Sequence, residues 1–121
     1  MGFRLRYATA KDFEQFVETP LTCRVRAFAA VTEDDSVIGV GGLAFLPDGT
    51  TTAFVHATDE ARKHPISAHR AGLRAMAEAK RLGIKRIVAT AAPEIKSAER
   101  WLLRLGFCET EVAGSKVFIW Q

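Results

Sequence analysis

The segment RKHPISAHRAGLRAMAEAKRLGIKR, residues 62–86, decides the fold because the character of the sequence changes within it. Pro65 suits the first position of a helix, where the N–H that proline lacks would have no partner. Alanine-rich sequence follows to about Leu82, and Gly83 can end a helix in the left-handed conformation. The segment therefore predicts a basic loop, a long helix over residues 65–82 and a turn.

Four short runs before this segment favour β-strands. They are FRLRYA (3–8), RVRAFAAV (24–31), VIGVGGLAFL (37–46) and TTAFVHAT (51–58). Each is rich in apolar, β-branched or aromatic residues. PDGT (47–50) is a strong turn signal, so the last two runs are predicted to form a hairpin. Gly39, Gly41 and Gly42 either weaken the third strand or mark a bulge in it.

A short helix is predicted between the first two strands. Thr9 suits its N-cap, and Asp12 places a carboxylate near the positive end of the helix dipole. Phe13, Phe16 and Val17 would then line one face. Only about 16 residues (9–24) separate the two strands, so there is room for little more than this one helix.

The sequence after the long helix predicts a further strand, a helix and two closing strands. IKRIVATA (84–91) is short and mostly apolar, as expected of a strand between two layers. A helix is predicted from the spacing of Ile95, Ala98, Trp101, Leu102 and Leu105, with Gly106 at its end. FCETEV (107–112) and SKVFIW (115–120) complete the order β-α-β-β-β-α-β-α-β-β. This order predicts one α+β domain over residues 1–121, with helices covering a mixed sheet.

Composition fits a single compact domain. Hydrophobic residues make up 48% of the chain and charged residues 26%. No apolar stretch approaches the roughly 18–20 residues needed to span a bilayer, and the N-terminus lacks an apolar signal core. Cys23 and Cys108 have no metal-ligand spacing, and we expect both to be reduced. We therefore expect a cytoplasmic protein with no membrane partner and no metal site.

Charge is distributed unevenly along the chain. Residues 1–60 carry 5 Lys and Arg against 9 Asp and Glu, whereas residues 61–121 carry 12 against 5. A basic second half suits an anionic partner such as a nucleotide, a phosphorylated cofactor or nucleic acid, although it is equally compatible with a solvated face. Nucleic acid is the least favoured partner, because the sequence contains no helix-turn-helix pattern or aromatic stacking strip.

Three segments resemble the GCN5-related N-acetyltransferase (GNAT) family. SAERWLLRLGF (97–107) looks like the helix that ends in the family's Leu-Gly-Phe turn. LGIKRIVATAAP (82–93) resembles the strand that follows the cofactor-binding helix. EDDSVIGVGGLAFLPDGTTTAFVHAT (33–58) is similar to the central hairpin. The order of elements extends the resemblance over nearly the whole chain and implies a GNAT-like, mostly antiparallel sheet.

The resemblance implies that acetyl-CoA, or a related CoA ester, lies where the fourth and fifth strands splay apart. Its diphosphate would rest on amides at the start of the long helix, in a loop that occupies residues 62–67 or 63–68. Neither register has the family's first glycine, and Pro65 removes one amide. Basic side chains at a helix N-terminus, where the dipole disfavours them, favour an anionic partner. The implied cofactor-binding residues are Phe54, Val55, Arg62, Lys63, Ile66, Ser67, Ala68, His69 and Arg70.

The implied catalytic groups are incomplete. The family commonly uses a tyrosine acid four residues before the glycine of the Leu-Gly-Phe turn, and here that position is Leu102. An asparagine that often lies seven residues earlier corresponds to Ile95. His56 is the candidate base because imidazole exchanges protons near neutral pH, the alternative being a structural strand histidine. Trp101 is expected to pack in the core, the alternative being an aromatic ring beside the cofactor gap.

The expected function is transfer of an acetyl group from acetyl-CoA to an amine. A single short helix near the acceptor side suggests an open site that suits a protein or peptide amine, or an acceptor site that has been lost. The alternative is a catalytically inactive GNAT-fold scaffold, such as a phage virion or accessory component. KVFIW (116–120) is a candidate edge strand through which a homodimer could form.

Overall fold

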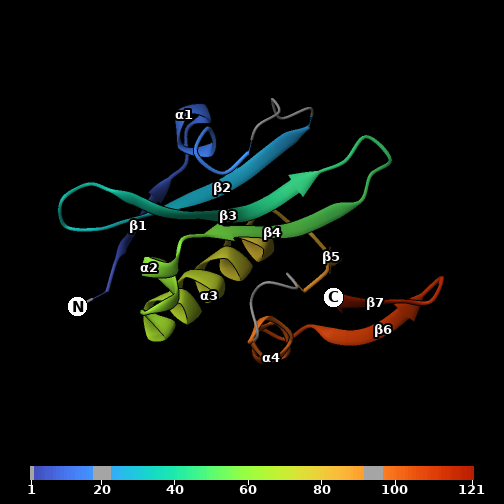
Figure 1. Cartoon of the computed structure of the whole chain (residues 1–121). Coiled ribbons are helices and arrows are strands. Elements are labelled where there is room, and N and C mark those ends of the chain that lie inside the picture. The colour runs from blue at the N-terminus through green and yellow to red at the C-terminus, as the bar shows by residue number, and fades with distance from the viewer. Residues whose placement is uncertain (1, 18–22, 92–96) are drawn as a thin grey trace.

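The computed structural model describes residues 2–17, 23–91 and 97–121. These residues form one seven-stranded sheet whose strands lie in the order β1-β2-β3-β4-β5-β7-β6 (Figure 1). The strands are β1 (Arg4–Tyr7), β2 (Arg24–Val31), β3 (Val37–Phe45), β4 (Thr51–Ala57), β5 (Ile87–Ala89), β6 (Cys108–Val112) and β7 (Ser115–Trp120). Neighbouring strands are antiparallel except for the parallel pair β4–β5. The predicted mixed, mostly antiparallel sheet is therefore confirmed.

The helices are α1 (Ala10–Phe13), α2 (Asp59–Arg62), α3 (Pro65–Arg81) and α4 (Ala98–Arg104). α3 is the long predicted helix, with Pro65 in its first turn and Gly83 at a φ of 76° just beyond its end. α2 was not predicted, although its signals are present in the sequence. The Thr58 hydroxyl accepts a hydrogen bond from the Ala61 amide at 3.4 Å, and acidic residues fill the first turn.

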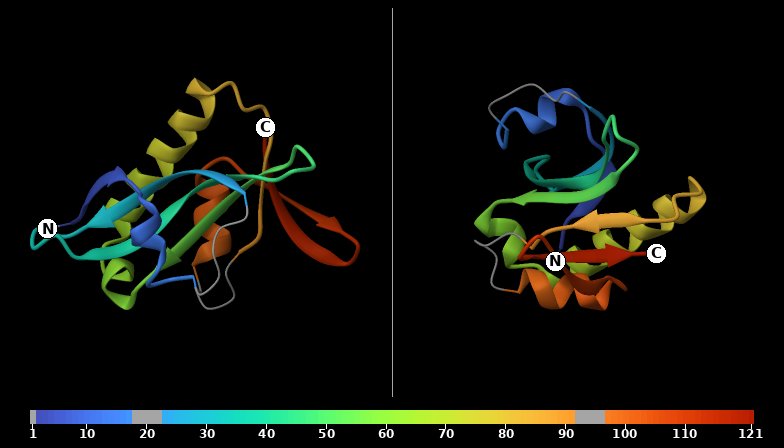
Figure 2. Two further views of the ribbon diagram at one scale, coloured as in Figure 1. Left: turned by 90° about the horizontal axis from the view of Figure 1, so that it is seen from above. Right: turned by 90° about the vertical axis from the view of Figure 1, so that its right-hand side faces the viewer.

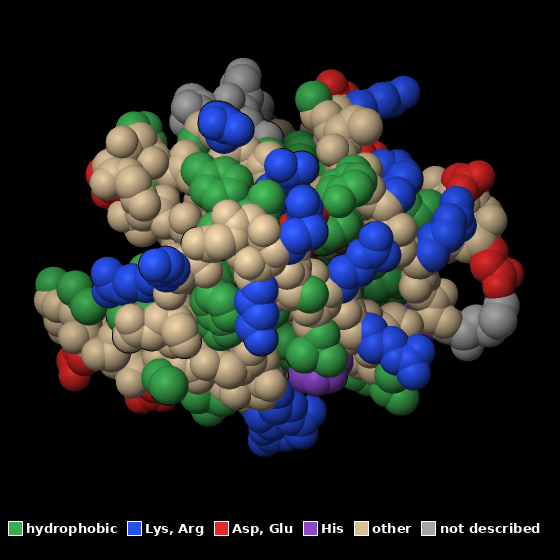
Figure 3. All heavy atoms as spheres, turned by 180° about the vertical axis from the view of Figure 1, so that it is seen from behind, with side chains coloured by type: hydrophobic (Ala, Val, Ile, Leu, Met, Phe, Trp, Pro, Cys, Tyr) green, Lys and Arg blue, Asp and Glu red, His purple; other side chains and the backbone are tan. Residues whose placement is uncertain are grey.

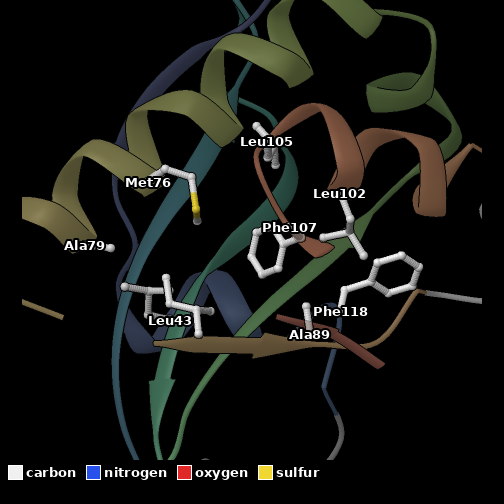
Figure 4. Packing of buried hydrophobic residues seen from close by; sticks show 9 residues of the cluster. Leu43, Met76, Ala79, Ala89, Leu102, Leu105, Phe107 and Phe118 are labelled. Atoms are coloured by element: carbon white, nitrogen blue, oxygen red, sulfur yellow. The ribbon is translucent and has the colours of Figure 1, made fainter. Parts of the chain in front are cut away.

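The helices cover both faces of the sheet. α1 lies on one face, whereas α3 and α4 lie on the other (Figure 2). Under α1, Phe13 packs with small and branched residues of β2 and β3. The larger core lies between the sheet and α3 and α4, where Met76, Leu102 and Phe107 pack against Phe118 and its neighbours (Figure 4). Within the described residues, no helix has both the length and the apolar character needed to cross a bilayer.

The glycines of β3 have two different roles. Ala30 pairs with Gly39 while Val31 pairs with Val37, so Gly39 flanks a β-bulge. Gly42 instead marks the closest approach of β2 and β3, because a Cβ atom there would lie 2.2 Å from the Arg26 carbonyl oxygen. The bulge that the sequence allowed is therefore present, and a second glycine is required by the packing of two strand backbones.

The prediction that residues 116–120 form a sheet edge was wrong. β7 pairs with β5 on one side and with β6 on the other, and its Phe118 is fully buried. The edge strands of the sheet are β1 and β6. Every residue of β6 is exposed and two are glutamates, which is typical of an edge strand, whereas the apolar β7 is buried within the sheet.

Candidate functional site

The central feature of the site is the separation of β4 from β5. The two strands pair at a single position, Thr52 with Val88. Beyond it, residues 53–57 of β4 still pair with β3 but not with β5. Alternate residues of this stretch direct their N–H and C=O groups away from β3, so they are available to an extended ligand arm.

A cavity of about 320 Å³ occupies this separation, and we call it the gap cavity. Ala53, Phe54, Val55 and His56 of β4 form one wall. Most of the remaining wall is small or apolar and comes from α3, from the residues after β5, and from α4. The gap cavity is therefore a largely apolar space bordered by strand backbone with unused hydrogen-bonding groups.

A second cavity of about 280 Å³ adjoins the first, and we call it the basic cavity. It lies between strands β1–β4, the N-terminal half of α3 and one side of α4. Among the described residues, its charged lining residues are Arg62, Arg100 and Arg104. Within the same part of the chain, the two cavities share four lining residues, namely Phe28, Gly41, Val55 and Trp101. Together they can hold a ligand with an anionic end and an apolar arm.

The N-terminus of α3 borders the basic cavity and keeps unused amides. The first helical hydrogen bond runs from the Ala68 amide to the His64 carbonyl oxygen at 2.9 Å. The Ile66 and Ser67 amides precede that bond, and Pro65 has none to offer. The His64 side chain does not cap the helix. Two amides at the positive end of a 17-residue helix are therefore available to an anion.

Helix α2 and the two residues that follow it carry ion pairs near the surface. The Arg62 guanidinium lies 3.0 Å from Asp59, and the Lys63 amine lies 3.5 Å from Glu60. The His64 imidazole lies 3.6 Å from the same Glu60. Exposed pairs of this kind contribute little to stability. A phosphate could therefore replace Asp59 and Glu60 as the partner of these cations at a small cost in folding free energy.

The structure brings together only part of the predicted cofactor set. Arg62, Ala68 and His69 line the basic cavity, and Phe54 lines the gap cavity while Val55 lines both. The other predicted residues line neither cavity; they are Lys63, Ile66, Ser67 and Arg70. Their assignment to cofactor binding stays a prediction.

His56, the predicted base, lies on the face of the sheet that carries α1. Its ring is 6.3 Å from that of Phe16 and 6.1 Å from that of Phe54, which in turn contacts Phe13. The side chain is exposed and lines the gap cavity. The basic cavity extends under α3 and α4 on the opposite face. A base at His56 would thus reach the gap cavity from the face of the sheet opposite to the arginines of the basic cavity.

The positions where the resemblance implies an acid offer none. Leu102 is 9% exposed and lines the gap cavity, so it faces the expected space without a proton to donate. Ile95 lies outside the described residues. Tyr7 donates a hydrogen bond to Glu78 at 3.0 Å, which joins β1 to α3. The described residues contain no cluster of three His, Cys, Asp or Glu side chains that could hold a metal ion.

Sequence reasoning missed Arg100 and Arg104. They are four residues apart on α4 and therefore share a helix face, which the structure turns toward the basic cavity. The spacing was visible in SAERWLLRLGF, but two arginines four apart on a helix usually lie in solvent. Only their position in the wall of the cavity that Arg62 also lines distinguishes them from a solvated pair.

Comparison with solved structures supports the fold. A GNAT-superfamily phosphinothricin acetyltransferase from Sinorhizobium meliloti, in complex with AcCoA, has a TM-score of 0.75 at 16% identity over 98% of this chain and 86% of that one. An acyl-CoA N-acyltransferase candidate from Klebsiella pneumoniae has a TM-score of 0.73 at 12% identity over 98% and 96%. A mutant spermidine N-acetyltransferase from Vibrio cholerae has a TM-score of 0.66 at 15% identity over 97% and 91%. No protein-family model and no curated protein sequence matches the chain. The chain therefore has the GNAT fold.

Proposed function

We propose that the protein is an N-acyltransferase that moves an acetyl group from acetyl-CoA to an amine. The observation that carries this proposal is the separation of β4 from β5 beside a cavity lined by three arginines. An acyl-CoA has the matching shape, with an anionic diphosphate, an extended arm rich in amides, and a small thioester. The fold shared with acetyltransferases supports the same assignment.

Each part of the bound acetyl-CoA has a proposed partner in the protein. Arg62, Arg100 and Arg104 would hold the phosphates by charge-assisted hydrogen bonds. The Ile66 and Ser67 amides, whose residues line neither cavity, would contribute only to a phosphate bound at the start of α3. The free edge of β4 would pair with amides of the arm, as an added strand does. The thioester would then lie in the apolar gap cavity.

His56 is proposed as the base. The amine nitrogen must lose a proton before it attacks the thioester carbonyl carbon, and an exposed imidazole at the gap can accept it. The carbon–sulfur bond then breaks and the CoA thiolate leaves. Because Leu102 cannot donate a proton, water would protonate the thiolate. We propose a peptide or protein amine as acceptor, since α1, the one helix that the described residues place on that face, contains only four residues.

Calorimetric titration with acetyl-CoA, CoA and ATP tests the donor site. We expect acetyl-CoA and CoA to bind in the micromolar range and ATP to bind much more weakly, because ATP lacks the arm. The triple variant Arg62→Ala, Arg100→Ala, Arg104→Ala should lose CoA binding while remaining folded. The control variant Lys80→Ala, Lys85→Ala, Arg86→Ala removes the same charge from exposed positions at the other end of α3 and should bind normally. Equal loss in both variants would contradict the proposed site.

Release of free thiol from acetyl-CoA in the presence of polyamines, amino acids and lysine peptides tests turnover. We expect His56→Gln to lower the rate by about 10²-fold or more, with CoA binding unchanged, because general-base catalysis is removed. Phe16→Leu alters a neighbour of the same ring and should have a much smaller effect. Undiminished turnover by His56→Gln would exclude the imidazole as the base, and CoA binding without turnover on any amine would contradict the proposed reaction.

A further inference from the structure

Trp101 lies where the two cavities meet. It is one of the four residues that line both cavities, and the other three are Phe28, Gly41 and Val55. Those three have no polar side-chain atom, so the indole N–H is the only side-chain hydrogen-bonding group among the four. A ligand that extends from the basic cavity into the gap cavity must pass this residue.

The indole N–H of Trp101 has no partner among the described residues. Its Nε1 atom is shielded from solvent and forms no hydrogen bond to the described residues. Such a group is uncommon in native proteins, because burial removes its bond to water without replacing it. The described residues include one other orphaned side-chain atom, His69 Nδ1, which also belongs to a residue of the basic cavity. Both unpaired atoms thus belong to residues that line the basic cavity.

The indole packs closely against α3. A Cβ atom at Gly72 would lie 3.0 Å from Trp101 Cζ2 and 2.9 Å from both Leu105 methyl carbons. Glycine at position 72 therefore lets the Trp101 ring on α4 lie close to the backbone of α3. A ring held in this way presents its N–H in one direction, so little conformational entropy would be lost when an acceptor arrives.

We propose that the Trp101 N–H donates a hydrogen bond to an oxygen of the bound acyl-CoA arm at this junction. This inference rests on the proposed function. The acceptor is a carbonyl oxygen of the arm or a phosphate oxygen beside it, since an indole N–H donates and never accepts. Because the group is shielded in the free chain, the arm must part the neighbouring side chains to reach it. Trp101 is therefore a binding residue as well as a core residue.

The variant Trp101→Phe tests the proposal because it removes the N–H and keeps an aromatic ring. We expect CoA and acetyl-CoA to bind about tenfold more weakly to it by calorimetry, the usual effect of one lost hydrogen bond. The stability of the free variant should change little, because removing the unpaired donor stabilises it while the packing lost with the smaller ring destabilises it. Trp120→Phe is the matched control, because Trp120 lines neither cavity, and its affinity should not change.

The outcomes separate this inference from the proposed function. A wild-type chain that binds neither CoA nor acetyl-CoA overturns both. Wild-type binding with equal affinity in Trp101→Phe overturns the indole bond alone and would mean that water satisfies the N–H. Lower affinity accompanied by a proportionate loss of stability would show a packing role and would also overturn it.

Tryptophan fluorescence gives a second measurement. The chain contains two tryptophans, so Trp120→Phe leaves Trp101 as the sole indole. We expect its emission to change in a saturable way as CoA is added, with the midpoint that calorimetry gives. An unchanged spectrum at saturating CoA would contradict contact at the junction.

Discussion

Asp12 shows how one buried carboxylate organises the start of the chain. It is 7% exposed and accepts two hydrogen bonds from the Arg6 guanidinium, at 2.7 and 2.9 Å. The Thr9 amide donates a third at 2.6 Å. These bonds, those from Arg6 above all, lower the pKa of Asp12 to about 2. The sequence predicted the carboxylate near the helix start, whereas the Arg6 pair required β1 to lie alongside α1.

The variant Asp12→Asn should be less stable than the wild type by about 1–2 kcal/mol at pH 7, a value reduced because Arg6 is half exposed. The folded pKa lies below the unfolded value of about 3.9, so the stabilisation is complete above about pH 4 and is lost as pH falls toward 2. Urea unfolding of both proteins across this range measures the difference. A difference that stayed constant down to pH 2 would show that ionisation of Asp12 is not its source.

At the scale of elements, the pairing of β2 with β3 depends on the absence of a side chain at Gly42. A Cβ atom there would lie 2.2 Å from the Arg26 carbonyl oxygen and 2.7 Å from Ala27 Cα. Both atoms belong to the backbone of the neighbouring strand and cannot rotate away. β3 in turn pairs with β4, so any displacement would reach the wall of the gap cavity.

Gly42→Ala should therefore cost at least about 3 kcal/mol and broaden thermal unfolding, because two central strands must separate. Gly49→Ala is the control: its φ is positive as well, at 90° against 159° for Gly42, but no atom lies within 4 Å of the added methyl group. The control should lose only about 1–2 kcal/mol from backbone strain. Similar losses in both variants, measured by chemical denaturation, would argue against a clash between the strands.

β6 is an edge strand and could therefore form the predicted homodimer by pairing with a second copy of itself. A two-fold antiparallel pairing of β6 with its own copy, centred on Thr110, would place Glu109 of each strand opposite Glu111 of the other. Like charges directly opposite one another destabilise a sheet. The strand thus disfavours self-pairing in this register, and the homodimer stays a prediction.

At the scale of the whole molecule, the distribution of positive charge is consistent with an anionic ligand in the basic cavity. Lys and Arg side chains are spread over the face seen in Figure 3, with Asp and Glu mainly at its periphery. The basic second half of the sequence includes all three arginines of the basic cavity. A clustered positive field attracts an anionic ligand over a distance of about one Debye length, and salt screens it.

Binding of CoA should consequently weaken about three- to tenfold when NaCl rises from about 50 mM to about 500 mM. Pantetheine, which has the arm but no phosphate, should bind weakly and with almost no dependence on salt. Calorimetry with both ligands makes the comparison. Equal salt dependence for the two would mean that the arginines do not contact the phosphates.

Local chemistry made much of the fold predictable from the sequence. Pro65 and Gly83 mark where α3 begins and ends, since one lacks an N–H and the other accepts a left-handed backbone. The turn at 47–50 predicted the β3–β4 hairpin, and alternation or apolar runs predicted the strands. The order of elements therefore followed from residues that lie close together in sequence.

Only the tertiary structure decided what depends on distant contacts. The insertion of β7 between β5 and β6 is a choice of strand neighbour that the order of elements along the chain does not specify. Arg62 lines the same cavity as Arg100 and Arg104 only because α4 packs beside α3. The unpaired N–H of Trp101 likewise depends on every group around it. Sequence alone thus determined most of the helices and strands and the Arg62 side of the site. Packing decided that Arg100, Arg104 and the Trp101 N–H belong to the same site.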